Sequence, residues 1–149
     1  MSKISRRMFL AGVVAGAAAV IYSSIEAHRI IVTRLRLGLG VKTAFLADTH
    51  THSMGPVEKK VLEVLRRERP RIILHGGDVI DEFTGPLDQI RFYLSYMEAE
   101  EKYAVLGNHD YWCGRTGELM RVLTECGFKV LRDEVVESGV GKILGVDWR

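Results

Sequence analysis

The chain has 149 residues, which is enough for one ordinary domain. Hydrophobic residues make up 47% and charged residues 27% of it, a balance typical of a folded protein and not of a disordered tail. The net charge of +2 is small and basic residues are interspersed with acidic ones without a long basic run, so a nucleic-acid partner is not expected.

Residues 1–28 are predicted to form a signal or a membrane anchor. Lys3, Arg6 and Arg7 precede an uncharged run from Met8 to Ile25 that is rich in Ala, Gly and Val, as in an n-region followed by an h-region. The run has about eighteen residues, near the lower limit for crossing a bilayer. The basic start would keep the N-terminus cytoplasmic, so we expect residues 29–149 to lie outside the cytoplasm, either anchored or exported.

The segment Ser5-Arg6-Arg7-Met8-Phe9-Leu10 resembles the twin-arginine export signal S-R-R-x-F-L. Such signals are addresses that a receptor reads, and the resemblance implies export of a folded protein that sometimes already carries metal. A plain signal anchor and a buried core helix stay open as alternatives. Cleavage also stays open, because Glu26-Ala27-His28 is a poor small-x-small site. His28 is predicted to be an exposed linker residue.

Strands and helices are predicted to alternate along the rest of the chain. Short apolar or β-branched runs indicate strands, and apolar stripes at helical spacing indicate helices. The predicted strands are 29–37, 42–47, 71–74, 102–106, 128–131, 134–137 and 142–146, and the predicted helices begin at Pro56, Pro86 and Gly117. This order predicts an α/β domain with a mostly parallel sheet flanked by helices, whose ligands gather at the carboxyl ends of the strands.

Polar side chains able to bind metal follow three successive predicted strands. The three segments are Asp48-Thr49-His50, Gly76-Gly77-Asp78 and Gly107-Asn108-His109-Asp110. Oxygen and imidazole donors suit Mn²⁺, Fe or Zn²⁺. The Asp78 carboxylate can bridge two cations, and two metals roughly 3.5–4 Å apart can polarise a phosphoryl group and generate a hydroxide nucleophile.

The order D-x-H, G-D and G-N-H-D resembles the signature of calcineurin-like metallophosphoesterases, from about Thr43 to the C-terminus. The resemblance implies half of a four-layer αββα sandwich and a metal-dependent hydrolase of phosphate esters with two divalent metal ions. The phrase from Leu106 to Trp112 resembles a membrane-associated branch that hydrolyses UDP-diacylglucosamine-type lipid precursors. The implied substrate is a phosphorylated small molecule or a lipid-linked phosphate.

The resemblance also implies a role for each motif residue. His109 would be the catalytic imidazole, and Asp110 would orient it and favour its charged form. Asn108 and His109 would also contact the substrate. The implied metal ligands are Asp48 and His50 for the first metal, Asp78 as the bridge and Asn108 for the second metal.

Relatives carry a further isolated histidine and a G-H-x-H motif in a second half, whereas no histidine follows His109 here. We therefore expect a fragment, a split protein whose partner chain supplies the missing histidines, or a weakly active or inactive membrane-anchored remnant that binds metal. We also expect an exposed apolar face where the second half of the sandwich would pack.

Other histidines, aromatic residues and cysteines lie near the three motifs in the sequence. His52 is expected to be solvated or to lie behind the ligands, and His75 is expected beside the site without binding metal. Tyr111 and Trp112 fit a substrate cleft or the core equally well. Cys113 and Cys126 are predicted to be unpaired thiols, although a bridge stays open. The chain has no G-x-G-x-x-G or P-loop motif, which disfavours a nucleotide-binding Rossmann module.

Overall fold

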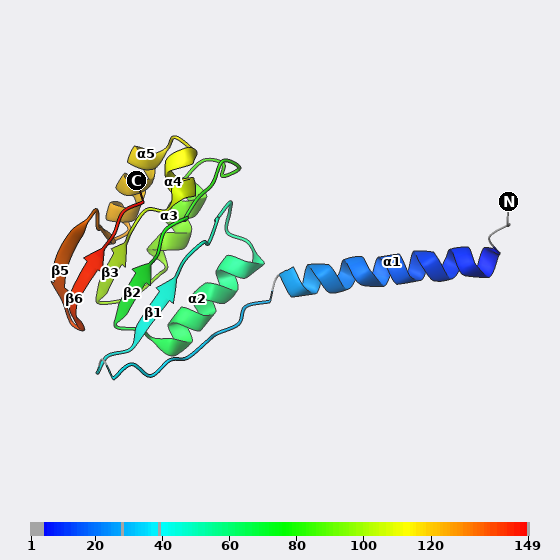
Figure 1. Cartoon of the computed structure of the whole chain (residues 1–149), viewed down its shortest axis with the longest axis horizontal. Coiled ribbons are helices and arrows are strands. Elements are labelled where there is room, and N and C mark those ends of the chain that lie inside the picture. Colours follow the sequence, from blue (N-terminus) through cyan, green and yellow to red (C-terminus); the bar gives the residue numbers. More distant parts are fainter. Residues whose placement is uncertain (1–4, 28, 39, 149) are drawn as a thin grey trace. The chain divides into compact units, whose positions relative to one another are not determined.

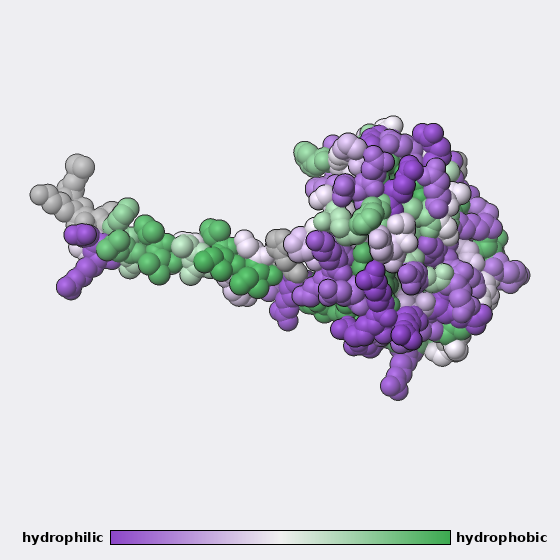
Figure 2. All heavy atoms as spheres, turned by 180° about the vertical axis from the view of Figure 1, so that it is seen from behind, coloured by the Kyte–Doolittle hydropathy of each residue, from purple (hydrophilic) through white to green (hydrophobic). Residues whose placement is uncertain are grey.

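The computed structural model describes residues 5–27, 29–38 and 40–148, in two compact units whose boundary in the chain lies between Thr33 and Arg34. The first unit contains helix α1 (Arg6–Ala27), and the Ser5 hydroxyl accepts a hydrogen bond from the Met8 backbone N–H in its first turn. The helix is long and apolar enough to cross a membrane, and Figure 2 shows hydrophobic residues along it. The predicted apolar N-terminal helix is confirmed; whether it is a signal or an anchor stays a prediction.

The second unit is built on a parallel sheet of four strands (Figure 1). The strands lie in the order β1 (Thr43–Leu46), β2 (Ile72–His75), β3 (Glu101–Ala104) and β4 (Lys129–Val130). Helices α2 (Pro56–Glu68), α3 (Asp88–Ser95), α4 (Asn108–Trp112) and α5 (Thr116–Glu125) connect them. An antiparallel hairpin follows, made of β5 (Glu134–Ser138) and β6 (Gly141–Gly145). The predicted α/β class with a parallel sheet is confirmed.

Helix α2 shows how local sequence sets the element boundaries. Pro56 occupies the first helical position, where its missing N–H costs nothing. The Glu58 carboxylate accepts a hydrogen bond from the Gly55 backbone N–H over 2.9 Å. The helix ends where Arg69 turns into the left-handed region at φ 48°, just before Pro70, which cannot continue a helix.

Side chains that alternate along the strands form two separate cores. The larger core lies between the sheet and its helices and includes Ile73, Leu94, Ala104 and Leu119. The smaller one lies on the other face, where Ile72 and Tyr103 pack against Leu131 and Val136 of the hairpin region. Helix layer, sheet and hairpin are thus three successive layers. The second face is only partly covered, since Phe45 on β1 is 70% exposed, in line with the predicted exposed apolar face.

One predicted strand was wrong. Residues 29–37 are described without regular structure. Their β-branched residues favour a strand only where a neighbouring strand completes the hydrogen-bond ladder, and the Arg34 guanidinium instead donates to Glu68. The short helix α4 was not predicted, because Gly107-Asn108-His109-Asp110 was interpreted as a polar segment at the end of a strand. The other predicted strands and helices are confirmed within a few residues at their ends, and His28 lies outside the described residues.

Candidate metal centre

The loops after β1 and β2 run side by side at the carboxyl edge of the sheet. The Asp48 N–H donates to the Gly77 carbonyl and the His50 N–H donates to the Asp78 carbonyl, both over 3.0 Å. Asp48, His50 and Asp78 all adopt left-handed backbone conformations, with φ of 52°, 39° and 51°. Such conformations are uncommon outside glycine, and their concentration at one edge is typical of a functional site.

The segment after β3 contacts the loop after β2 at Asp78. This residue is only 6% exposed, and its Oδ1 accepts a hydrogen bond from the His109 backbone N–H over 2.8 Å. Gly107 makes the approach feasible, because a Cβ atom there would overlap the Asp78 carboxylate. Gly77 also needs to be glycine, since its φ is 97° and a Cβ would lie 2.5 Å from the Gly107 nitrogen.

Three predicted site residues meet in one cluster. Ligand atoms of His50, Asp78 and His109 all lie within 4.8 Å of one another. The two imidazole rings are 4.8 Å apart between centroids and nearly perpendicular, at 86°. The buried His50 Nδ1 has no hydrogen-bond partner. Because an orphaned buried nitrogen beside a carboxylate is a suitable cation ligand, these residues fit a divalent metal.

The remaining predicted ligands differ in their placement. Asn108 is partly buried and precedes His109 in the first turn of α4, so it reaches the same edge of the sheet. Asp48 is exposed and does not belong to the three-residue cluster. The structure therefore brings three of the five residues expected to meet into one cluster, with Asn108 next to His109 in the sequence and Asp48 on the same loop as His50 but outside the cluster.

The Asp110 carboxylate forms neither a hydrogen bond nor an ion pair with the His109 ring, whereas its predicted orienting role would require one. Its side chain is fully buried, and its two oxygens accept hydrogen bonds from the Ile80 and Gly107 backbone N–H groups, each over 3.0 Å. Burial raises the pKa of Asp110 above its ordinary value, although these backbone donors oppose the shift. Asp110 thus ties the loop after β2 to the start of α4.

Glu82 contacts the His109 ring instead. Its Oε2 lies 3.2 Å from His109 Nδ1, and this hydrogen bond raises the pKa of His109. The prediction from sequence missed Glu82. The only signal was the acidic pair Asp81-Glu82 shortly after Gly77-Asp78, and nothing in that pair indicates which imidazole it meets.

His52 agrees with both predicted placements, because its side chain is 52% exposed and it contacts Asp81 behind His50. Its Nε2 is 2.8 Å from Asp81 Oδ2, and the same carboxylate lies 3.6 Å from His50 Nδ1. Burial tends to raise the pKa of Asp81, but hydrogen bonds from His52, the Phe83 N–H and Thr84 outweigh it, so the pKa is lowered. Asp81 therefore stays anionic between two imidazoles.

His75 lies beside the site and is 2% exposed. The Gly77 N–H donates to its Nδ1 over 3.3 Å, so the neutral ring carries its proton on Nε2, 3.2 Å from the Thr49 hydroxyl oxygen. Burial lowers the pKa of His75 to about 4. Both ring nitrogens are thus engaged away from a metal ion.

Tyr111 and Trp112 lie in different surroundings. Trp112 is 58% exposed, and its ring lies 5.1 Å from that of His109 and 5.5 Å from that of Trp148. Tyr111 packs against the larger core and donates its hydroxyl to Asp147 over 2.5 Å. Trp112 therefore belongs to the rim of the site and Tyr111 mainly to the core. Cys113 and Cys126 are free thiols, as predicted.

Comparison with known proteins agrees with this geometry. A family profile described as calcineurin-like phosphoesterase matches residues 41–142. A protein of Aquifex aeolicus (strain VF5) named "Uncharacterized metallophosphoesterase" is 36% identical over 134 residues, which is 83% of this chain and 48% of the relative. The chain thus spans about half the length of this curated relative. No solved structure matches this chain at a significant level.

Proposed function

Because the chain belongs to the calcineurin-like phosphoesterase family, we propose that it hydrolyses phosphate esters with divalent metal ions bound at the carboxyl edge of its sheet. The observation that carries this proposal is the meeting of His50, Asp78 and His109 within 4.8 Å. Three loops from distant parts of the sequence converge there, and the donors are of the kinds that Mn, Fe and Zn prefer.

The proposed site holds two metal ions. Asp78 Oδ1 is held by the His109 N–H, and a carboxylate has further lone pairs on both oxygens to share between cations. His50 and Asp48 would complete the first metal site and Asn108 the second. Bound in this way, the metals would polarise the phosphoryl group and lower the pKa of a bound water.

His109 is proposed to act on the phosphate itself. Glu82 favours its charged form, and an imidazolium can stabilise negative charge on the phosphoryl oxygens or protonate the leaving oxygen. Asn108 would contact the same phosphate. Trp112 and Trp148 border the site and would pack against the alcohol portion of the ester.

The proposed location is the membrane or the space outside the cytoplasm. Helix α1 is long and apolar enough to span a bilayer, and Arg6-Arg7 sit at its start as in a twin-arginine signal. The proposed substrate is a phosphorylated small molecule or a lipid-linked phosphate, including the UDP-diacylglucosamine type. The proposal includes no nucleic-acid partner.

The test is metal-dependent turnover by the full chain in detergent. We expect hydrolysis of bis-p-nitrophenyl phosphate with added Mn²⁺, its loss with a chelator, and its loss in Asp78→Asn. Asp88→Asn is the matched control, because Asp88 is exposed at the start of α3. Asp88→Asn should keep full activity.

Calorimetric titration with Mn²⁺ separates the alternatives. Binding without turnover would favour a remnant, and turnover that appears only with a second chain carrying G-H-x-H would favour a split protein. Failure to bind Mn²⁺ in a folded chain would overturn the proposed metal centre.

A further inference from the structure

A basic surface lies at the edge of the sheet opposite the candidate metal centre. Residues 34–42 lead into the start of β1, and residues 66–71 lead from the end of α2 to the start of β2. These two segments, here called the basic edge, hold seven basic residues and one acidic residue, a formal charge of +6. The rest of residues 34–149 holds ten basic and seventeen acidic residues, a formal charge of −7. The unit is therefore strongly polarised.

Glu68, the one acidic residue of the basic edge, joins its two segments. Its Oε1 accepts a hydrogen bond from Arg34 over 2.5 Å, and its Oε2 lies 3.5 Å from Lys42 Nζ. The Arg67 side chain lies 3.7 Å from the same carboxylate. One carboxylate thus gathers three cations and leaves the region with a large excess of positive charge.

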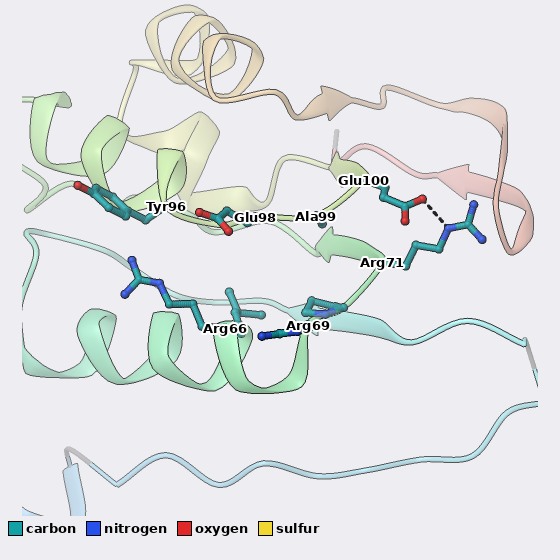
Figure 3. A pocket seen from close by; sticks show the side chains of 9 residues that line it. Arg66, Arg69, Arg71, Tyr96, Glu98, Ala99 and Glu100 are labelled. Atoms are coloured by element: carbon teal, nitrogen blue, oxygen red, sulfur yellow. Dashed lines mark hydrogen bonds and ion pairs between the residues drawn. The ribbon is translucent and has the colours of Figure 1, made fainter.

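A pocket of about 770 Å³ opens beside the end of α2 (Figure 3). Arg66 and Arg69 line one side and Tyr96 and Glu98 line the other, and Arg71 lies beside Glu100. Arg71 is neutralised by Glu100 at 2.7 Å. Arg66 lies 5.6 Å over the Tyr96 ring, and neither Arg66 nor Arg69 forms an ion pair among the described residues. Arg66 and Arg69 therefore offer two uncompensated guanidinium groups, which suit phosphate oxygens.

Large apolar side chains are exposed in the first segment of the basic edge. Leu35 and Leu37 are 76% and 70% exposed, and they alternate along the chain with Arg34 and Arg36. Exposed leucines beside arginines suit the boundary between headgroups and acyl chains of a bilayer. Only six residues separate Ala27, the last residue of α1, from Arg34, the first residue of the basic edge. A linker of this length spans at most about 25 Å.

We propose that the basic edge docks onto an anionic lipid surface, with Leu35 and Leu37 in the interface and Arg66 and Arg69 on lipid phosphates. This rests on the proposed membrane anchoring by α1. Because the candidate metal centre lies at the opposite edge of the sheet, docking turns it away from the lipid. Of the two substrate classes proposed above, docking therefore favours a phosphoester that reaches the site through water.

The test compares amide hydrogen exchange of the full chain in nanodiscs of phosphatidylcholine alone and with about one third phosphatidylglycerol. We expect slower exchange in residues 34–42 and 66–71 only with the anionic lipid, and loss of this protection in high salt. Arg66→Gln with Arg69→Gln should lower the docking equilibrium about thirtyfold. Lys59→Gln with Lys60→Gln removes two exposed charges from the same helix outside the basic edge and should lower it much less.

Each outcome has a distinct meaning. Equal exchange in both lipids would overturn the docking, and so would protection that glycerol phosphate in solution reproduces, since the pocket would then be a small-anion site. Flotation with vesicles checks anchoring by α1 separately from docking. Hydrolysis with Mn²⁺ checks the proposed function independently of both.

Discussion

The Asp78 carboxylate accepts a hydrogen bond from the His109 backbone N–H over 2.8 Å. This contact joins the loop after β2 to the first turn of α4, and thereby holds the proposed bridging ligand against the residue proposed to act on the phosphate. The same oxygen is the atom that a side chain at position 107 would displace. Fold and candidate chemistry therefore depend on one buried carboxylate.

Asp78→Asn should remove function and keep the fold. The Asn amide oxygen can still accept the His109 N–H, whereas the charge that holds divalent cations is lost. We expect Mn²⁺-dependent hydrolysis to fall at least about a hundredfold, as when a strong electrostatic contact is removed, while thermal unfolding changes by only a few degrees. Kinetics and thermal denaturation measure the two effects, and full activity in this variant would contradict the bridging role.

Asp110→Asn should instead lower the free energy of unfolding. An amide offers one acceptor oxygen, so either the Ile80 or the Gly107 N–H would lose its partner in a buried position. Leaving one buried donor unsatisfied costs about 1–3 kcal/mol, and we expect a loss of that size in urea unfolding. The pKa of His109 should stay unchanged in the variant. A lower His109 pKa with unaltered stability would restore the orienting role implied by the family resemblance.

Glu82→Gln should lower the pKa of His109. The hydrogen bond and charge of Glu82 raise it, so the imidazolium would lose its proton at a lower pH once the carboxylate is gone. The alkaline limit of any activity that needs protonated His109 should move to lower pH as well. NMR titration of the histidine ring with a chelator present measures the shift. Glu63→Gln, an exposed change on α2, is the control and should leave the titration unaltered.

Buried His75 should make stability depend on pH. Its pKa is about 4 in the folded chain against an ordinary value of 6.5, so between these values the unfolded chain binds more protons. Stability should therefore fall as the pH decreases from about 6.5 to 4, by up to roughly 3 kcal/mol. Urea unfolding at several pH values measures this slope. His75→Gln should show a shallower slope, and an identical slope in both proteins would contradict the assignment.

The fold was largely predictable because its strands are short, apolar and bounded by polar motifs. Residues 71–74 predicted β2 closely, since a central parallel strand buried on both faces has a clear hydrophobic signal. Residues 42–47 predicted the edge strand β1 from a short apolar run. Residues 29–37 are also rich in apolar and β-branched residues, but they pair with no strand among the described residues. Composition alone does not indicate whether a partner strand is present. Helix α4 was missed because Asp110 stabilises it from within a motif that also fits a turn.

The candidate site was predictable only in part, for a related physical reason. The convergence of His50, Asp78 and His109 follows from parallel strands that share an edge. The contact between Glu82 and His109 joins residues 27 apart in sequence, and it depends on how two loops pack. Roles that depend on such loop packing, including that of Asp110, cannot be obtained from motif order.

Gly107→Ala tests whether close packing at the carboxyl edge is required. A Cβ atom at position 107 would overlap the Asp78 carboxylate and approach its backbone nitrogen to 2.6 Å, so the loop after β2 must move. We expect a destabilisation of about 1–3 kcal/mol from this overpacking, together with weaker Mn²⁺ binding in calorimetric titration.

Gly117→Ala is the matched control, because a Cβ there meets no atom within 4 Å. In helix α5 that change should stabilise by about 0.5–1 kcal/mol and leave Mn²⁺ binding intact. Equal stability and metal affinity in both variants would show that the approach of Gly107 to Asp78 is not needed.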